Sequence, residues 1–254
     1  MRALITGATS GLGAAFAEAL AERGDDLVLV ARDEARLRER AEQLHSAFGV
    51  QVDIHRADLS VAEDLAGVVT ALESSERPID MLVNNAGFGV HAKLCDPDPT
   101  AHRAALDVMC YAVLVLGGAA GRTMRTRGHG RIINISSLAS WISQGHYSAI
   151  KVWVRAYSEG LANELHGTGV TVTAACPGWV RTEFHQRAGI RTSTIPDWVW
   201  LEPRPVVRQI LRDADRGKVI SVPAGRWRAA RTALQLMPAG GVRAIARALV
   251  KSRD

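Results

Sequence analysis

Short runs of aliphatic and β-branched residues alternate with longer segments of helical periodicity along almost the whole chain. Residues 3–6 are followed by a helical segment at 12–23, and residues 27–31 by another at 34–48. Strands that are apolar on both faces and separated by helices are typical of a parallel sheet covered on both sides. We therefore expect an α/β fold with a doubly wound parallel sheet and ligands at the carboxyl ends of its strands.

The alternation continues without a linker, an internal repeat or a low-complexity segment, which indicates a single domain over residues 1–254. The remaining predicted strands are residues 52–56, 79–84, 131–136, 170–176 and 218–222, and the helices are 61–75, 100–127, 146–166 and 203–216.

Composition excludes several classes of protein. Hydrophobic residues make up 47% of the chain, enough for a large core. Cys95, Cys110 and Cys176 are odd in number and far apart, which suits a reducing compartment and gives no disulfide or zinc framework. The eight histidines show no metal-ligand spacing, so we expect no metal. A strand beginning at Arg2 leaves no room for a signal peptide, and we expect a cytoplasmic protein.

The most apolar stretch, residues 104–120, contains Asp107 and two glycines. We interpret it as a helix buried against the sheet or a partner subunit, in preference to a membrane span.

The C-terminal part of the chain is basic. Residues 204–254 carry twelve Lys or Arg against three Asp or Glu. Two short helical pieces with apolar sides, 226–237 and 242–251, form a basic tail over about 226–254. Such helices can lie on an anionic membrane surface as a peripheral contact, but packing on the body or on a second subunit is commoner. No recognition motif accompanies the charge, so we expect no nucleic-acid binding.

Three glycines, Gly7, Gly11 and Gly13, lie between the first strand and its helix. A glycine-rich turn lets the backbone approach a pyrophosphate, and the helix N-terminus presents free N–H groups. The alternative is a tight turn without a ligand. The spacing G-x-x-x-G-x-G also departs from the generic G-x-G-x-x-G pattern.

Tyr147 and Lys151 are four residues apart in GHYSAIK, downstream of the serine pair Ser136 and Ser137. Positions i and i+4 share a helix face, so the ammonium can sit beside the ring. A tyrosine titrates near pKa ~10, and a close ammonium favours its phenolate, as acid–base catalysis requires. The alternative is a surface tyrosine with an unrelated lysine.

With these motifs in this order, the chain resembles the short-chain dehydrogenase/reductase family along most of its length, though only loosely after about Glu183. The resemblance is carried by TGATSGLG at 6–13, NNAG at 84–87, Tyr147-x-x-x-Lys151, and CPG at 176–178 followed by Thr182.

The resemblance implies a Rossmann-like fold, a homodimer or homotetramer, and an NAD(P)-dependent oxidoreductase. Tyr147 would be the general acid/base, Lys151 would bind the nicotinamide ribose, and Ser137 would hold the substrate oxygen. The implied cofactor-binding residues are Gly7, Thr9, Ser10, Gly11, Leu12, Gly13, Arg32, Asp58, Leu59, Asn85, Ala86, Gly87, Tyr147, Lys151, Pro177, Gly178, Val180 and Thr182.

Two features depart from the family pattern. Met109 stands where relatives have an asparagine that anchors a water for proton relay, and a methionine cannot hydrogen-bond like an amide. Either another group, backbone or water replaces it, or catalysis is slower. Ser137 precedes Tyr147 by ten residues, roughly three fewer than in many relatives. This shortening leaves Ser136 or Ser137 as the inward serine, and we assign Ser137.

Cofactor choice depends on the end of the second strand, where Arg32 precedes Asp33. An acidic residue here typically binds the ribose hydroxyls of NAD, whereas an arginine accommodates the 2′-phosphate of NADP. We predict NADP(H) over NAD; alternatively, Arg32 merely stacks on the adenine. Asp58 resembles the residue that contacts the adenine amino group, and its alternative role is to cap the next helix.

Four tryptophans lie near the expected cleft, although core packing is the usual role of this residue. Residues 191–203 are predicted to form a loop within a substrate-lid insertion at about 183–203. We expect an apolar or bulky substrate. The tentative substrate residues are Ser137, Trp141, Trp179 and Trp198, with Trp200 nearby.

The sequence thus predicts NADP(H)-dependent reduction of a ketone or aldehyde, or oxidation of the matching secondary alcohol. The alternative is a non-catalytic dinucleotide-binding redox sensor, associated with a membrane through its tail.

Overall fold

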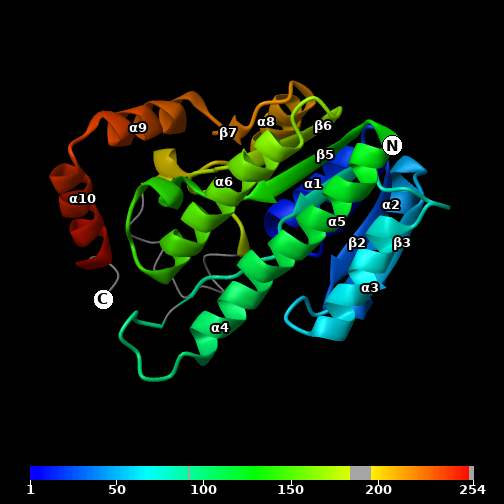
Figure 1. Cartoon of the computed structure of the whole chain (residues 1–254), viewed down its shortest axis with the longest axis horizontal. Helices are drawn as coiled ribbons and strands as arrows, with labels where there is room; N and C mark the ends of the chain where they lie inside the picture. The colour runs from blue at the N-terminus through cyan, green and yellow to red at the C-terminus, as the bar shows by residue number, and fades with distance from the viewer. Residues whose placement is uncertain (91, 184–195, 252–254) are drawn as a thin grey trace.

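The computed structural model describes residues 1–90, 92–183 and 196–251. Its strands form one parallel sheet in the order β3-β2-β1-β4-β5-β6-β7 (Figure 1). This arrangement confirms the doubly wound α/β fold. The strands are β1 Arg2–Thr6, β2 Asp26–Ala31, β3 Val52–Arg56, β4 Met81–Asn84, β5 Gly130–Ile135, β6 Val170–Ala175 and β7 Ile220–Ser221.

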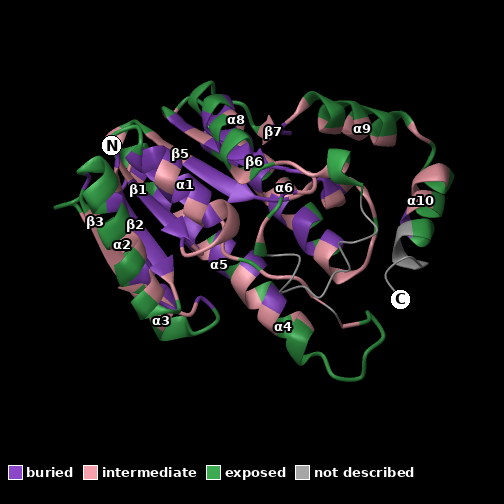
Figure 2. Cartoon of the chain, turned by 180° about the vertical axis from the view of Figure 1, so that it is seen from behind, coloured by how far each residue is buried: buried purple, intermediate pink, exposed green. Residues whose placement is uncertain are grey.

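Helices cover both faces of the sheet, as Figure 2 shows from the buried strands between partly exposed helices. Helices α1, α2 and α8 pack on one face, and α3, α5 and α6 on the other. The helices are α1 Gly11–Ala21, α2 Glu34–Phe48, α3 Ala62–Glu73, α4 Thr100–Leu106, α5 Ala112–Arg127, α6 His146–Glu164, α8 Pro203–Asp215, α9 Gly225–Leu236 and α10 Ala239–Lys251. Short 3₁₀ helices are η2 Leu138–Trp141 and η4 Asp197–Val199, and η1 Asp107–Tyr111 is a π-helical turn.

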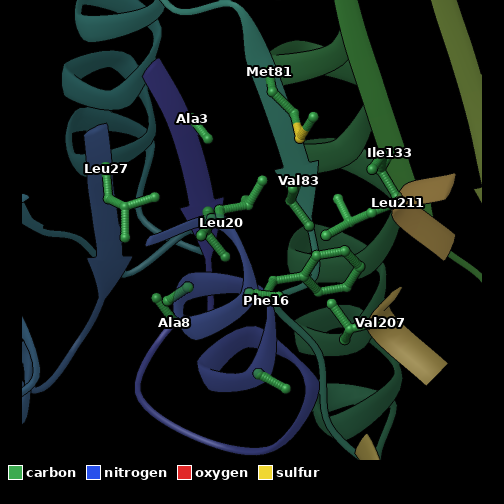
Figure 3. Packing of buried hydrophobic residues seen from close by; sticks show 14 of the residues in the cluster. Ala3, Ala8, Phe16, Leu20, Leu27, Met81, Val83, Ile133, Val207 and Leu211 are labelled. Carbon is green, nitrogen blue, oxygen red and sulfur yellow. The ribbon is translucent and has the colours of Figure 1, made fainter. Parts of the chain in front are cut away.

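The central strands are apolar throughout because successive side chains enter opposite cores. In β4, Met81 and Val83 pack on the side of α1 and α8, while Leu82 packs on the side of α3 and α5. Figure 3 shows Phe16 of α1 with its ring between Val83 and Val207. Phe16 is fully buried, so α1, which follows the glycine-rich turn, is fixed against the sheet.

The predicted helix at 100–127 is not regular. A π-helical turn at Asp107–Tyr111 separates α4 from α5. By length and composition this stretch could cross a membrane, since an 18-residue window within it has a mean hydropathy of 1.7. However, 56% of that window is buried inside the molecule. Because α5 packs on α3, β4 and β5, it is a core helix of this fold.

The basic tail forms two helices, α9 and α10, that lie beyond the β7 edge of the sheet and far from α2 and α3 (Figures 1 and 2). Helix α9 contacts η2, and its Trp227 packs on Leu138 and Val222. Trp227 also contacts Gly178, where an added Cβ would overlap the indole ring. Leu236, expected on an apolar side, is 81% exposed. The tail is therefore docked on the body through α9, at Trp227 and at Arg231, which lies against Trp141.

Two glycine substitutions test the packing at the first turn. A Cβ at Gly13 would overlap the carbonyl oxygen of Gly7, whereas a Cβ at Gly160 in α6 would meet nothing within 4 Å. We expect Gly13→Ala to destabilise the protein by ~1–3 kcal/mol through overpacking. The matched control Gly160→Ala should stabilise it by ~0.5–1 kcal/mol through helix propensity. Urea denaturation measures both, and equal effects would contradict this packing.

Candidate active site

The glycine-rich turn has a backbone that other residues adopt poorly. Gly7 and Gly11 have φ angles of 66° and 56°, in the left-handed region. Ser10 precedes α1 in an extended conformation, and its side chain does not cap the helix. The first N–H groups of α1 and its positive dipole end are therefore available to an anion at this turn.

Side chains from β1 and from the segment after β4 hold the turn in place. The amide of Asn85 donates to the carbonyl oxygens of Thr6 at 2.9 Å and Gly7 at 3.2 Å. The Thr6 hydroxyl oxygen accepts the backbone N–H groups of Asn85 and Ala86, each at 3.0 Å. Asn85, predicted as a cofactor contact, thus uses its side chain to shape the turn.

The loop after β6 closes the same turn from the other side. A Cβ added at Gly11 would lie 3.3 Å from the Cβ of Thr182. The structure therefore brings together three of the sequence motifs, the glycine-rich turn, NNAG and the CPG loop, at the carboxyl ends of β1, β4 and β6. This is the crevice where a doubly wound sheet binds its ligand.

A buried polar chain links the central strands to α6, and the sequence reasoning missed it. Asn84 donates to the side-chain oxygen of Asn134 at 2.9 Å, and Asn134 donates to the Ser158 hydroxyl at 3.0 Å. The signal was present, because an asparagine inside an apolar strand such as RIINIS must find a buried partner.

Two hydrogen bonds of Lys151 join the end of β5 to α6, one through its backbone and one through its side chain. The Ser136 hydroxyl donates to the Lys151 carbonyl oxygen at 2.7 Å, and Lys151 Nζ donates to the Ile135 carbonyl oxygen at 2.8 Å. Lys151 Nζ lies 5.5 Å from the centroid of the Tyr147 ring. The structure thus places the predicted tyrosine and lysine side by side at the end of β5.

The two serines differ in their surroundings. Ser136 is 1% exposed and its hydroxyl is used by the Lys151 carbonyl. Ser137 is half-buried and caps η2, where its Oγ accepts the N–H of Ala139 at 3.1 Å. Its hydroxyl proton is not used in that bond, which favours Ser137 as the donor to a substrate oxygen.

Burial sets the charge state of Lys151. The side chain is almost fully buried, and this desolvation lowers the pKa of Lys151 to about 8. Besides Tyr147, Cys110 and Cys176 lie close to it, and burial raises the pKa of these thiols to about 11 and 12. Both thiols are therefore neutral near pH 7 and supply no counter-charge.

Met109 lies in the π-helical turn and is 1% exposed. Its thioether packs on Gly87, where an added Cβ would be 3.0 Å from the sulfur. Met109 thus fills the position next to NNAG with an apolar side chain. Turns of this kind are frequent at functional sites.

His146, the first residue of α6, precedes Tyr147 and meets His102 of α4 edge to face, with ring centroids 4.4 Å apart. Burial, and then His102, lower the pKa of His146. The sequence reasoning did not single out this pair, since the two residues are 44 positions apart.

The end of β2 carries the groups expected to read the cofactor. The Arg32 side chain is 76% exposed, and its Nη1 lies 3.9 Å from Asp58 Oδ2. Asp33 caps α2 by accepting the N–H of Arg36 at 3.1 Å. Asp58 accepts from the N–H and hydroxyl of Ser60, which, with Arg32, lower the pKa of Asp58. The N-cap of α3 is Val61, so Asp58 shapes the preceding turn instead of capping that helix.

The tryptophans fall into separate groups. Trp179 and Trp200 meet edge to face at 5.5 Å, where residues 180 and 201 form a parallel bridge. Trp198 is 69% exposed in η4. Trp141 instead lies 4.8 Å and 5.3 Å from the guanidinium groups of Arg155 and Arg231.

Most of the predicted lid, residues 184–195, lies outside the described residues. Within the described residues, no three His, Cys, Asp or Glu side chains cluster as metal ligands.

The buried Lys151 predicts a specific pH dependence of stability. Its pKa falls from 10.5 in the unfolded chain to about 8 in the folded protein. The folded state therefore releases this proton first, and stability rises as pH increases between these values. Relative to Lys151→Met, the wild type should gain about 2 kcal/mol in free energy of unfolding between pH 8 and 10.

Urea denaturation of the cofactor-free protein measures this gain. Lys93→Met, which removes an exposed lysine, controls for the loss of one charge. A difference between wild type and Lys151→Met that stays constant over this range would contradict the depressed pKa.

The chain is similar to known proteins over the region that contains these motifs. The family model for short chain dehydrogenase matches residues 1–191. A short-chain reductase, NovJ of Streptomyces niveus, is 39% identical over 194 residues, which cover 74% of this chain and 73% of NovJ.

Two solved structures are similar over almost the whole chain. A short-chain dehydrogenase from Sphingobium yanoikuyae in complex with NADPH has a TM-score of 0.84 and 35% identity, covering 92% of this chain and 93% of its own. The bulky-bulky ketone specific alcohol dehydrogenase from Comamonas testosteroni has a TM-score of 0.79 and 32% identity, covering 92% of each chain.

The family match spans the glycine-rich turn, NNAG, the serine pair and the Tyr147–Lys151 pair. The chain therefore belongs to the short-chain dehydrogenase/reductase family and is an oxidoreductase that acts on CH–OH or C=O groups with a nicotinamide dinucleotide.

Proposed function

We propose that the chain is an NADP(H)-dependent carbonyl reductase, which also oxidises the matching secondary alcohol. The observation that carries the proposal is the buried Lys151, whose Nζ lies 5.5 Å from the Tyr147 ring centroid at the carboxyl end of β5. An acid–base pair and an anion-binding turn share the same edge of the sheet.

When bound, NADPH would be the source of the hydride that adds to the carbonyl carbon, and the side chains of this chain would handle the proton and the oxygen. Ser137 donates a hydrogen bond to the carbonyl oxygen, where negative charge develops. The Tyr147 hydroxyl transfers its proton to that oxygen, and the Lys151 ammonium stabilises the phenolate that remains. The Ile135 carbonyl holds the ammonium in position at 2.8 Å.

The cofactor site fits a dinucleotide because Gly7 and Gly11 adopt the left-handed backbone conformations that shape the loop leading into the N-terminus of α1, where an anion can bind. The turn is bounded by Thr182 on one side and by Asn85 on the other. The proposed contacts are those that the family resemblance implies, with Arg32 at the 2′-phosphate. Asp33 already serves as the N-cap of α2, which favours phosphate recognition over ribose recognition at this position. The Sphingobium relative, solved with NADPH, supports the same choice.

We propose an apolar, bulky ketone as the substrate. The Trp179–Trp200 pair provides aromatic surface next to the loop after β6, and the Comamonas relative is described as specific for bulky-bulky ketones. Trp198, in the described part of the predicted insertion, would border the substrate from η4. Trp141 would border the cleft from η2.

Met109 affects the route by which a proton returns to Tyr147 after the reaction. Its buried thioether cannot anchor a water as an amide would. We propose that the relay passes instead through Lys151 and water on the backbone carbonyls near it.

We further propose a cytoplasmic homodimer or homotetramer. Tyr111, Leu114 and Val152 are 56%, 44% and 40% exposed on η1, α5 and α6, apolar surface that a second copy would cover. The tail would at most add a weak, salt-sensitive peripheral contact with anionic membranes.

The proton donor is tested by Tyr147→Phe. This substitution removes only the phenolic hydroxyl, so folding and dinucleotide binding should persist while ketone reduction falls by ~10²-fold or more. NADPH oxidation followed by absorbance measures the rate. Tyr111→Phe, at an exposed tyrosine, should retain activity. Near-wild-type activity of Tyr147→Phe would exclude this residue as the acid.

Cofactor preference is tested by calorimetric titration with NADPH and NADH. Wild type should bind NADPH more tightly, and Arg32→Ala should lose ~1.5–3 kcal/mol of NADPH binding, as expected for a charge-assisted contact. Binding of NADH should change little. Equal affinity of the wild type for both dinucleotides would reject the NADP assignment.

A further inference from the structure

Arg36 extends from the first turn of α2 to the glycine-rich turn. Its backbone N–H is fixed by the Asp33 cap at 3.1 Å. Its guanidinium Nη2 donates to the Thr9 carbonyl oxygen at 3.3 Å. Arg36 therefore places a positive charge directly against the turn predicted to bind the dinucleotide.

The neighbouring arginines of α2 show that this placement is specific. Arg38 is paired with Glu34 one helical turn away, with its Nε at 3.2 Å from the carboxylate. Arg40 donates to Gln43 and to the carbonyl oxygen of Ala14 inside α1. Among these three arginines, only Arg36 reaches the loop between β1 and α1.

The charge of Arg36 is only weakly neutralised by the ion pair recorded for it. Its Nη2 lies 3.9 Å from Glu183 Oε1, and Arg32 lies equally far from Asp58. Both side chains are substantially exposed, at 42% and 76%. A guanidinium has five N–H donors, so each arginine retains donors for a ligand after these contacts.

The position matches the part of the cofactor that distinguishes NADP from NAD. In a doubly wound fold, the adenine ribose lies between the glycine-rich turn and the end of β2. Arg32 stands at the end of β2, and Arg36 stands at the turn. A phosphate monoester carries about −1.5 to −2 charges near pH 7, which two guanidinium groups can neutralise and one cannot.

We propose that Arg36 is a second specificity-determining residue, which binds the 2′-phosphate of NADP(H) together with Arg32. This proposal rests on the NADP(H) preference proposed above. It assigns recognition of the phosphate to two arginines, one directly after β2 and one in the first turn of α2. The competing role is structural: Arg36 would only fasten the Thr9 carbonyl, and its loss would then weaken every dinucleotide.

Calorimetric titration of the full chain with NADPH and NADH separates the two roles. Arg36→Ala should weaken NADPH binding about tenfold or more, as expected for loss of a charge-assisted contact. NADH binding should change less than about twofold. Arg38→Ala is the matched control, because it removes an arginine from the same helix that does not reach the turn, and both affinities should persist.

A second probe reports the phosphate directly. Adenosine 2′,5′-bisphosphate should bind wild type more tightly than 5′-AMP, and Arg36→Ala should remove much of that difference. Arg36→Lys should retain part of it, since it preserves the charge without the planar fork. In Arg32→Ala/Arg36→Ala the losses should be non-additive, because both residues contact one phosphate.

Several results would overturn the proposal. An equal loss of NADPH and NADH affinity in Arg36→Ala would show that the arginine only fastens the turn. Unchanged NADPH affinity in a variant with wild-type circular dichroism would show that it does not touch the phosphate. The NADP(H) preference itself is measured in the wild type. If the wild type does not prefer NADPH over NADH, the NADP assignment is rejected, and this outcome differs from a failure of Arg36 alone.

Discussion

The Lys151 ammonium and the Ile135 carbonyl oxygen form the contact on which the site depends. A buried cation is costly unless its donors are satisfied, and the 2.8 Å bond to the end of β5 provides a fixed partner. The Ser136 hydroxyl donates to the Lys151 carbonyl oxygen. The two bonds together fix the position of α6 relative to β5. Tyr147 lies one helical turn earlier on α6, so the same bonds fix its place next to the end of β5. Burial beside the neutral thiols of Cys110 and Cys176 lowers the pKa of Lys151 to about 8.

Similar polar contacts organise the rest of the crevice. Thr6 and Asn85 fix the glycine-rich turn to the segment after β4, and Asn134 ties β5 to α6 through Ser158. The Asn134–Ser158 bond is buried and the bonds of Asn85 are partly buried, and a lower local dielectric strengthens such bonds. The hydrophobic core sets the layers, and this polar edge sets the positions of the groups that meet the cofactor and the substrate.

Local patterns predicted much of this arrangement. The alternation of strands and helices, the Tyr147–Lys151 spacing and the glycine-rich turn depend on nearest neighbours in sequence and could be read directly. The π-helical turn at Met109 could not be predicted, because its backbone hydrogen bonds span five residues instead of the four of an α-helix and no sequence pattern marks the change. Trp141 was assigned to the substrate, but no pattern could show that Arg155 and Arg231 lie against its ring, because Arg231 is 90 residues away. Arg36 was missed because its partner is the Thr9 backbone, which has no sequence signature.

The central claim, direct hydride transfer between a nicotinamide and a substrate carbonyl, is tested most directly by isotope transfer. A bulky ketone would be reduced with NADPH carrying deuterium at C4 in one configuration and then in the other, and the product alcohol analysed by NMR. We expect deuterium on the carbinol carbon from one of the two labelled forms and none from the other, because the cofactor would be held in one orientation. Product without label from either form, or no product with any bulky ketone, would contradict it.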